Sequence, residues 1–215
     1  MSVEQPIGDA VLYVSSNVQP QVLDAFNDWC DTIHHFDTMR IDGFLSLRRL
    51  HLVDGVIDID APEFPILTLY QVEKASDADF STPSYAHHSA TYTPPPAGVV
   101  DAISYERTVY QRDGQLAAGT QPVGDACVTL VGVNGPWLAA AATTASETAG
   151  FLCAYRVANE QRAVLLVDVE EEATGREVLA ALSAIRHDGQ RHSVQLFSQV
   201  FPRSGVLVRD RVLRT

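Results

Sequence analysis

The sequence predicts an α+β protein built from two ferredoxin-like βαββαβ repeats whose antiparallel sheets pack face to face. First, strand-like and helix-like segments follow one another in the order βαββαβ, and this order then recurs. Second, a phrase is repeated, GFLSLRR at 43–49 and GFLCAYR at 150–156. Third, the strand-like segments at 44–50 and 67–72 are apolar on both alternating sides, so a second sheet must cover the face that the helices leave bare.

In the first half, a short apolar strand at 11–16 precedes an amphipathic helix. The helix begins at Gln19–Pro20, carries apolar residues spaced by threes and fours as far as Phe36, and ends before Asp42–Gly43. The remaining elements are three strands and one short helix that follows Thr82–Pro83. They are predicted at 43–53, 66–73 and 101–111 for the strands and at 84–92 for the helix.

The second half repeats this order after a glycine-rich polar segment at 112–125, which we interpret as a linker. Its predicted strands are at 127–134, 151–158, 162–170 and 193–201, and its helices at 137–150 and 173–185. LTLYQVE at 67–73 and VLLVDVE at 164–170 are a second local match, in the same order and on the same type of element.

Two such repeats in one chain predict an intramolecular dimeric α/β-barrel, because each half can cover the bare sheet face of the other. The predicted domains are an N-terminal repeat at 1–115, which carries the candidate cleft, and a C-terminal structural repeat at 116–215. This arrangement leaves room for a further homodimer.

Composition and charge favour a globular protein with small-molecule partners. Hydrophobic residues make up 46% of the chain and charged residues 20%, as in ordinary globular domains. The formal net charge is −12 and the basic residues are scattered, which disfavours nucleic acid and anionic membranes as partners. We therefore expect a small-molecule substrate, no nucleic acid and no membrane.

Cysteine usage and the N-terminal segment favour a cytoplasmic location. The three cysteines show no CxxC spacing, which argues against a disulfide framework or a zinc knuckle. The first residues contain no basic segment followed by a long apolar run, and no stretch has the length of a membrane span.

The first helix brings together four polar side chains that suit proton transfer. Asn27, Asp31, His34 and His35 lie three or four residues apart, so they are neighbours on the helix surface. His34 lies at the edge of the buried face, where an imidazole oriented by Asn27 or Asp31 can move a proton near neutral pH. The simpler alternative is a solvated Asp31–His35 pair beside a half-buried His34, and His35 is expected at the surface.

Further candidates come from the second predicted helix and from the strands. His87 and His88 are adjacent, so they point about 100° apart on a helix and do not suit one metal ion; we expect no metal site. One of them could face the cleft. Four tyrosines lie on the predicted first-half strands, Tyr13, Tyr70, Tyr105 and Tyr110, and any that faces the helices could donate a hydrogen bond to a substrate oxygen. Most are expected in the core, and Tyr70 is preferred because its strand is expected at the sheet centre.

Two arginines and one cysteine near these candidates have more limited expectations. Arg48 and Arg49 point to opposite faces of their strand, so at most one can address a given cleft, and the other is expected to pair with a carboxylate such as Glu73 or Glu106. Arg156 repeats the position of Arg49, which favours a structural role for Arg49. Cys30 lies on the apolar helix face, where a thiolate nucleophile is disfavoured. The sequence contains no glycine-rich phosphate loop, GxSxG or HExxH motif, so nucleotide cofactors, serine hydrolysis and zinc proteolysis lose support.

The segment from Phe26 to Arg49 resembles the EthD-like branch of the dimeric α/β-barrel proteins. Members of that branch commonly carry F-N-x-W-Y-D-x-x-H on the first helix, followed by a G-F-x-x-x-R-R strand. The matching residues here are Phe26, Asn27, Trp29, Asp31, His34, Gly43, Phe44, Arg48 and Arg49. Cys30 replaces the usual tyrosine, and His35–Phe36 replaces the usual Leu/Ile–Pro. The resemblance implies an isomerase, cyclase, decarboxylase or dehydratase.

The resulting expectation is a cofactor-independent enzyme that acts on a small apolar carbonyl, lactone or polyketide-like substrate by histidine acid/base catalysis. His34 would transfer the proton, and Tyr70 with His87 or His88 would stabilise an enolate oxygen. Two alternatives remain open. One is a non-catalytic small-ligand-binding or assembly module, and the other is a cofactor-free monooxygenase, implied by the resemblance, that would use Asn27 and Trp29.

Overall fold

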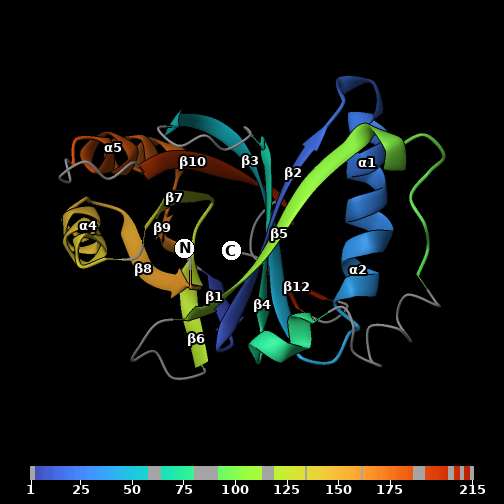
Figure 1. Cartoon of the computed structure of the whole chain (residues 1–215), viewed down its shortest axis with the longest axis horizontal. Coiled ribbons are helices and arrows are strands. Elements are labelled where there is room, and N and C mark those ends of the chain that lie inside the picture. Colours follow the sequence, from blue (N-terminus) through green and yellow to red (C-terminus); the bar gives the residue numbers. More distant parts are fainter. Residues whose placement is uncertain are drawn as a thin grey trace.

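The computed structural model of the chain forms a closed antiparallel barrel with helices on two opposite sides (Figure 1). It describes residues 3–57, 64–79, 92–112, 119–133, 135–160, 162–185, 192–202, 206–208 and 211–213. Eight strands form the barrel. They are β2 (Ala10–Val18), β3 (Phe44–Ile57), β4 (Ile66–Val72), β5 (Ile103–Arg112), β7 (Ala126–Gly132), β8 (Phe151–Ala158), β9 (Ala163–Val169) and β10 (His192–Phe201).

The predicted fold class is confirmed, and the two sheets also join at their edges. Neighbouring strands run in the order β2-β4-β3-β10-β7-β9-β8-β5, and β5 returns to β2. The two seams between the halves differ in length. At one seam β3 and β10 pair from Arg49–Phe201 to Ile57–Ser193, whereas at the other the described pairing of β5 with β8 is limited to Gln111 and Arg112.

Two short pairs of strands lie outside the barrel. β1 (Val3–Ile7) pairs with β6 (Gly119–Val123), and β11 (Val206–Val208) pairs with β12 (Arg211–Leu213) and touches β3. The segment at 112–125 was predicted as a linker, but part of it is strand β6, because Gln121 is buried opposite Gln5 of β1. The predicted domain boundary falls within 113–118, outside the described residues.

The helices cover the outer faces of the barrel. On one side, η1 (Pro20–Val22), α1 (Leu23–Trp29), the π-helical η2 (Cys30–His34) and α2 (His35–Thr38) form one continuous helical rod. On the opposite side lie α4 (Trp137–Ser146) and α5 (Glu172–Ser183) (Figure 1). Two short 3₁₀ turns, η3 (Ala75–Ala78) and η4 (Val100–Ala102), flank the first-half sheet. The helix predicted at 84–92 falls outside the described residues except for Tyr92. None of the helices in the described ranges is both long and apolar enough to cross a membrane.

A further repeated phrase, which was not used in the prediction, lies at the start of each repeat. QPIGDA at 5–10 and QPVGDA at 121–126 share five of six residues. In each half, the proline carbonyl of this phrase accepts a hydrogen bond from the fourth residue of the GF phrase. Ser46 Oγ donates to Pro6, and Cys153 Sγ donates to Pro122. Because equivalent residues make equivalent contacts, the two halves are structural copies.

The shared GF phrase builds the same strand entry in both halves. Gly43 and Gly150 have φ values of 88° and 82°, a conformation that favours glycine. Their carbonyls accept hydrogen bonds from the backbone N–H groups of Glu73 and Glu170, at 2.7 and 2.9 Å. The phrase therefore encodes architecture, as its repetition predicted.

The barrel interior contains a buried ion pair that joins the halves. Arg48 is 1% exposed, and it binds the Asp168 carboxylate and donates from Nε to Gln199 Oε1 at 2.8 Å. The predicted pairing of an arginine with a carboxylate is confirmed, but the partner is neither Glu73 nor Glu106, because Arg48 faces the barrel interior, where it meets Asp168 from the opposite half. Burial raises the pKa of Asp168, and the neighbouring Arg48 charge opposes that rise.

The equivalent position in the second half is Tyr155, whose environment is the pseudo-symmetric copy. Tyr155 accepts a hydrogen bond from Gln71 at 3.2 Å, and Arg112 donates to Gln71 at 2.8 Å while lying 4.4 Å from the centre of the Tyr155 ring. One half holds an ion pair at this position, and the other holds a neutral tyrosine–glutamine contact with an arginine over the ring.

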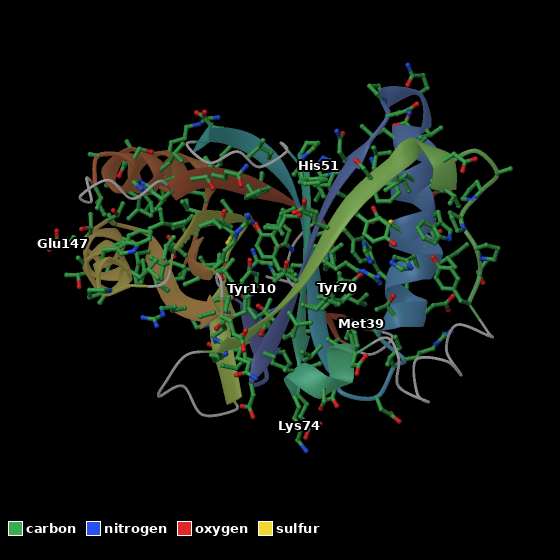
Figure 2. The ribbon with its side chains drawn as sticks, viewed as in Figure 1. Met39, His51, Tyr70, Lys74, Tyr110 and Glu147 are labelled. Atoms are coloured by element: carbon green, nitrogen blue, oxygen red, sulfur yellow. The ribbon has the colours of Figure 1, made fainter. Side chains whose placement is uncertain are left out.

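The first-half sheet thus separates an interior core from a helix-covered face. Tyr110 lies on the barrel side with Leu67 and Phe197, and Tyr70 lies on the helix side with Met39 and Phe44 (Figure 2). Any site between the helical rod and the sheet is consequently built on the Tyr70 face.

Candidate functional site

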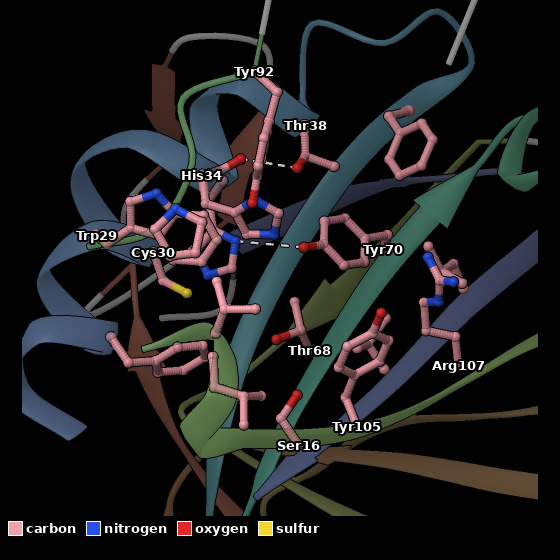
Figure 3. Close-up of a pocket in the computed structure, with 18 residues that line it drawn as sticks. Ser16, Trp29, Cys30, His34, Thr38, Thr68, Tyr70, Tyr92, Tyr105 and Arg107 are labelled. Carbon is pink, nitrogen blue, oxygen red and sulfur yellow. Dashed lines mark hydrogen bonds between the residues drawn. The ribbon is translucent and has the colours of Figure 1, made fainter. Parts of the chain in front are cut away.

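A cavity of about 400 Å³ lies between the helical rod and the first-half sheet (Figure 3). This volume is in the range of small-molecule sites. Its walls come from the helical rod, from the outer face of β2, β3, β4 and β5, and from the segment 92–100. The lining residues are Phe26, Trp29, Cys30, His34, His35, Thr38, Leu12, Val14, Ser16, Phe44, Thr68, Tyr70, Ile103, Tyr105, Arg107, Tyr92, Pro95 and Val100.

A π-turn in the rod determines which histidines reach the cavity. The segment Cys30–His34 is π-helical, and the extra residue in such a turn rotates the following residues by about 100° relative to a regular α-helix. His35 is 1% exposed and lines the cavity together with His34. The prediction of a surface His35 is therefore wrong, because regular helical periodicity does not hold across this turn.

His35 and Tyr70 form an uncharged polar pair in the cavity wall. The His35 Nδ1 lies 3.5 Å from the Tyr70 hydroxyl, a long contact of the kind common in ligand-free sites (dashed in Figure 3). Burial is the main cause that holds the pKa of His35 well below its ordinary value, with smaller contributions from His34 and Arg49. Burial likewise raises the pKa of Tyr70, so both groups are neutral at physiological pH.

His34 is held in an aromatic setting. Its ring lies parallel to the Trp29 indole, with centroids 4.5 Å apart, and Tyr92 packs against it edge-on at 5.6 Å. Trp29 Nε1 donates to the Thr93 carbonyl at 3.1 Å and so fixes the segment that carries Tyr92. His34 is half-buried, which leaves it between the cavity and solvent.

Asn27 and Asp31, which were predicted to orient His34, bind Arg49 instead. Arg49 is 2% exposed; it donates to Asn27 Oδ1 and, through Nη2, to both Asp31 oxygens at 2.7 and 2.8 Å. Neither Asn27 nor Asp31 lines the cavity. These contacts tie the helical rod to β3, because Arg49 faces the rod from the strand. The alternative of a solvated Asp31–His35 pair is also wrong, since His35 is buried.

The remaining candidates have simple outcomes. His87 and His88 lie in 80–91, outside the described residues. Burial raises the pKa of Cys30 to about 12, so its thiol stays protonated and is not a nucleophile at neutral pH. Within the described ranges, no group of three or more His, Cys, Asp or Glu side chains has the arrangement of a metal site.

Thr68, Tyr92 and Arg107 line the cavity but were not among the predicted site residues. Thr68 is two residues from Tyr70 on β4, and Arg107 is two residues from Tyr105 on β5, so each shares a sheet face with a predicted candidate. Aligning the predicted strands with one another could have found them. Tyr92 gave no such signal, because it reaches the cavity from a loop.

The matching face of the second half is packed differently. Trp137 and Leu138 of α4 are buried, and Ala141 and Ala145 bring the helix close to the sheet. The first half instead holds its helical rod off the sheet with large aromatic side chains, which accounts for the cavity there.

Comparison with known proteins shows the fold. No protein-family model and no curated protein matches the sequence. Among solved structures, an anthrone oxidase-like protein is 10% identical, with a TM-score of 0.56, and the match covers 96% of this chain and 95% of that one. A chlorite dismutase-like protein is 10% identical (TM-score 0.54, covering 92% and 97%), and a haem-binding protein from Thermus thermophilus is 8% identical (TM-score 0.52, covering 93% of each). These likenesses place the chain among dimeric α/β-barrel folds. They do not show the EthD-like branch.

Proposed function

We propose that this protein is a cofactor-independent enzyme that transfers protons on a small, largely apolar carbonyl compound bound in the cavity. The observation that carries the proposal is the uncharged His35–Tyr70 pair, which lies beside His34 in an otherwise mostly apolar wall. Perturbed, buried titratable groups of this kind in a concave site are typical of catalytic centres.

Tyr70 supplies the hydrogen bond that an enolate requires. When His35 carries its proton on Nδ1, it donates to the Tyr70 oxygen and leaves the Tyr70 O–H free to donate to the substrate carbonyl. The bond strengthens as negative charge develops on that oxygen, because the surrounding wall has a low dielectric constant. Tyr70 acts on the substrate and His35 is a positioning residue.

His34 is the proton carrier in this scheme. It removes a proton from the carbon next to the carbonyl, which leaves the enolate on Tyr70, and returns it to the same or another carbon. Trp29 fixes the plane of its ring, and its half-buried position allows exchange with solvent. Isomerisation, dehydration, decarboxylation and cyclisation all share this proton-transfer step.

Haem does not fit the described wall. An axial histidine must present a nitrogen to an open volume. The Nε2 atom of His35 is shielded from solvent, and His35 also packs against Phe201 at 5.2 Å. The His34 ring is covered by Trp29 on one face and contacted by Tyr92. Haem ligation would therefore require this wall to rearrange.

A cofactor-free monooxygenase is a second candidate, supported by Trp29 on the cavity wall. Asn27, the other residue that this candidate would use, is bound to Arg49 outside the cavity. Dependence of turnover on dissolved oxygen would identify this chemistry, and proton exchange without oxygen would oppose it.

The proposal predicts exchange of the protons next to the carbonyl of 1-tetralone, a bicyclic apolar ketone. In deuterated buffer, followed by NMR, the protein should accelerate this exchange over buffer alone. His34→Ala should lower the rate by about 10²-fold or more, the usual contribution of a general base. His192→Ala, the same change beside Trp137 in the second half, is the matched control and should keep the rate. A wild-type protein that exchanges no faster than buffer would leave a binding module as the better reading.

A further inference from the structure

The charged side chain on the cavity wall has the opposite sign to the net charge of the chain. The protein has a formal net charge of −12, yet the one Asp, Glu, Lys or Arg among the described lining residues is a cation, Arg107. Arg107 is exposed and its guanidinium lies 5.3 Å from the centre of the Tyr105 ring. Arginine is the side chain best suited to bind a carboxylate through two parallel hydrogen bonds.

Strand geometry turns the adjacent acid on the same strand away from the cavity. Ile103, Tyr105 and Arg107 alternate along β5 and line the cavity, whereas Glu106 points to the opposite face of the sheet. The strand therefore presents its cation, and not that acid, to the cavity.

Arg107 also stands at the mouth of the cavity. The described pairing of β5 with β8 is confined to Gln111 and Arg112, and the stretch that carries Tyr105 and Arg107 is exposed. Tyr105 is 55% exposed and Val100, another lining residue, is 61% exposed. Figure 3 shows Tyr105 and Arg107 at the end of the site opposite Trp29 and His34.

The deep end of the cavity is uncharged. Burial keeps the Cys30 thiol and the Tyr70 hydroxyl protonated and His35 neutral at physiological pH, because it shifts each pKa towards the neutral form. A ligand that fits this distribution has an apolar body and a single negative end.

The register of the sheet gives the approximate length of that ligand. Arg107 is opposite Val14 of β2, and Tyr70 lies one strand further, on β4. The β4 residue level with Arg107 is Thr68, and Tyr70 is two residues further along that strand. Two strand spacings and two residues along the strand together separate the two backbone positions by roughly 12 Å, a span that a fused two-ring body with a terminal carboxylate can bridge together with the reach of the two side chains.

We propose that the cavity selects an amphipathic anion, a planar body of about two fused rings with a carboxylate held by Arg107 at the mouth. This inference rests on the proposed function only in taking the cavity as the substrate site. It adds a specificity-determining residue and a charge to the ligand class.

The test compares 2-naphthoate with its neutral amide, 2-naphthamide, by titration calorimetry with the full chain. The wild type should bind the acid about tenfold more tightly than the amide, as one charge-assisted pair at a partly exposed site allows. Arg107→Gln should bring the ratio close to one with little change in the affinity for the amide. Arg107→Lys, which keeps the positive charge, should retain part of the preference for the acid.

The matched control is Arg176→Gln, the same change on α5, where the arginine pairs with Asp54 and Glu172. It should leave the ratio as in the wild type. Equal wild-type affinities, a preference that survives in Arg107→Gln, or binding of neither probe at millimolar concentration would each overturn the inference. An acid preference that depends on Arg107, in a protein without proton exchange, would instead uphold the inference and reject the proposed catalysis.

Discussion

The two adjacent histidines of the rod occupy different environments, and the different roles proposed for them rest on this difference. His34 is half-buried on Trp29, whereas His35 is 1% exposed and next to Tyr70. The sequence predicted a half-buried His34 and a surface His35, and the π-turn at Cys30–His34 is where regular helical periodicity, on which that prediction rested, no longer holds.

Burial of a neutral His35 predicts that stability falls in mild acid. The unfolded chain takes up a proton at the ordinary histidine pKa of 6.5, whereas the folded protein resists it because its His35 pKa is well below that value. Above pH 6.5, protonation of His35 should therefore not lower the free energy of unfolding. It should decrease below that pH by up to about 1.4 kcal/mol per pH unit for this group. His51, whose pKa is lowered to about 4, acts in the same direction.

Urea unfolding of the wild type and of His35→Gln at pH 7.0 and 5.5 measures this contribution. The variant should lose less stability between the two pH values than the wild type. Tyr70→Phe, which keeps the imidazole, should follow the wild type. Equal pH dependence in the wild type and in His35→Gln would show that His35 is protonated in the fold.

At the scale of the elements, strands and helices with strong periodicity followed the prediction closely. The strand at 151–158 and the helix starting at Trp137 have the predicted positions. The short strand β6 did not, because five residues with a proline and flanking glycines resemble a linker locally and gain their order only by pairing with β1.

The QPxGDA turn predicts equivalent costs at two glycines. A Cβ atom on Gly8 would lie 1.9 Å from the Val72 carbonyl oxygen, and one on Gly124 would lie 1.9 Å from the Val169 carbonyl oxygen. Since both neighbours are backbone, Gly8→Ala and Gly124→Ala should each lower the free energy of unfolding by about 3 kcal/mol. Gly98→Ala is the control: its φ is 84°, but nothing described lies within 4 Å, so it should cost about 1 kcal/mol. Urea titration distinguishes these outcomes, and similar small losses at all three sites would contradict the close approach.

At the scale of the whole molecule, the strands of the two halves join in one closed barrel. The fold class could be predicted, because repeated phrases and doubly apolar strands both required two facing sheets. The edge-to-edge closure through β3 and β10 could not, since residues 51–57 give no local sign of their partner. The cavity lies between the first-half helix and sheet, where the cleft was predicted, and Tyr70 lines it. Asn27 and Asp31 bind Arg49 instead of a histidine, and the direction of the Arg49 side chain could not be predicted from the sequence.

The buried Arg48–Asp168 pair predicts strong coupling between the halves. Asp168→Ala leaves an unpaired arginine in the barrel interior and should lower the free energy of unfolding by about 3–5 kcal/mol. The double variant Arg48→Met, Asp168→Leu should recover most of this loss, because it leaves neither charge of the pair buried. Chemical denaturation of the three proteins provides the comparison, and a stable Asp168→Ala variant would show that the pair is dispensable.

The proposed stabilisation of an enolate by Tyr70 can be measured through the exchange of 1-tetralone protons. Tyr70→Phe removes one hydroxyl from the site, and Tyr155→Phe removes one from the barrel interior, where it accepts from Gln71. Deuterium incorporation followed by NMR should fall about 10²-fold in Tyr70→Phe and stay near the wild-type rate in Tyr155→Phe. An unchanged rate in Tyr70→Phe, with both variants folded, would mean that the Tyr70 hydroxyl does not stabilise the enolate.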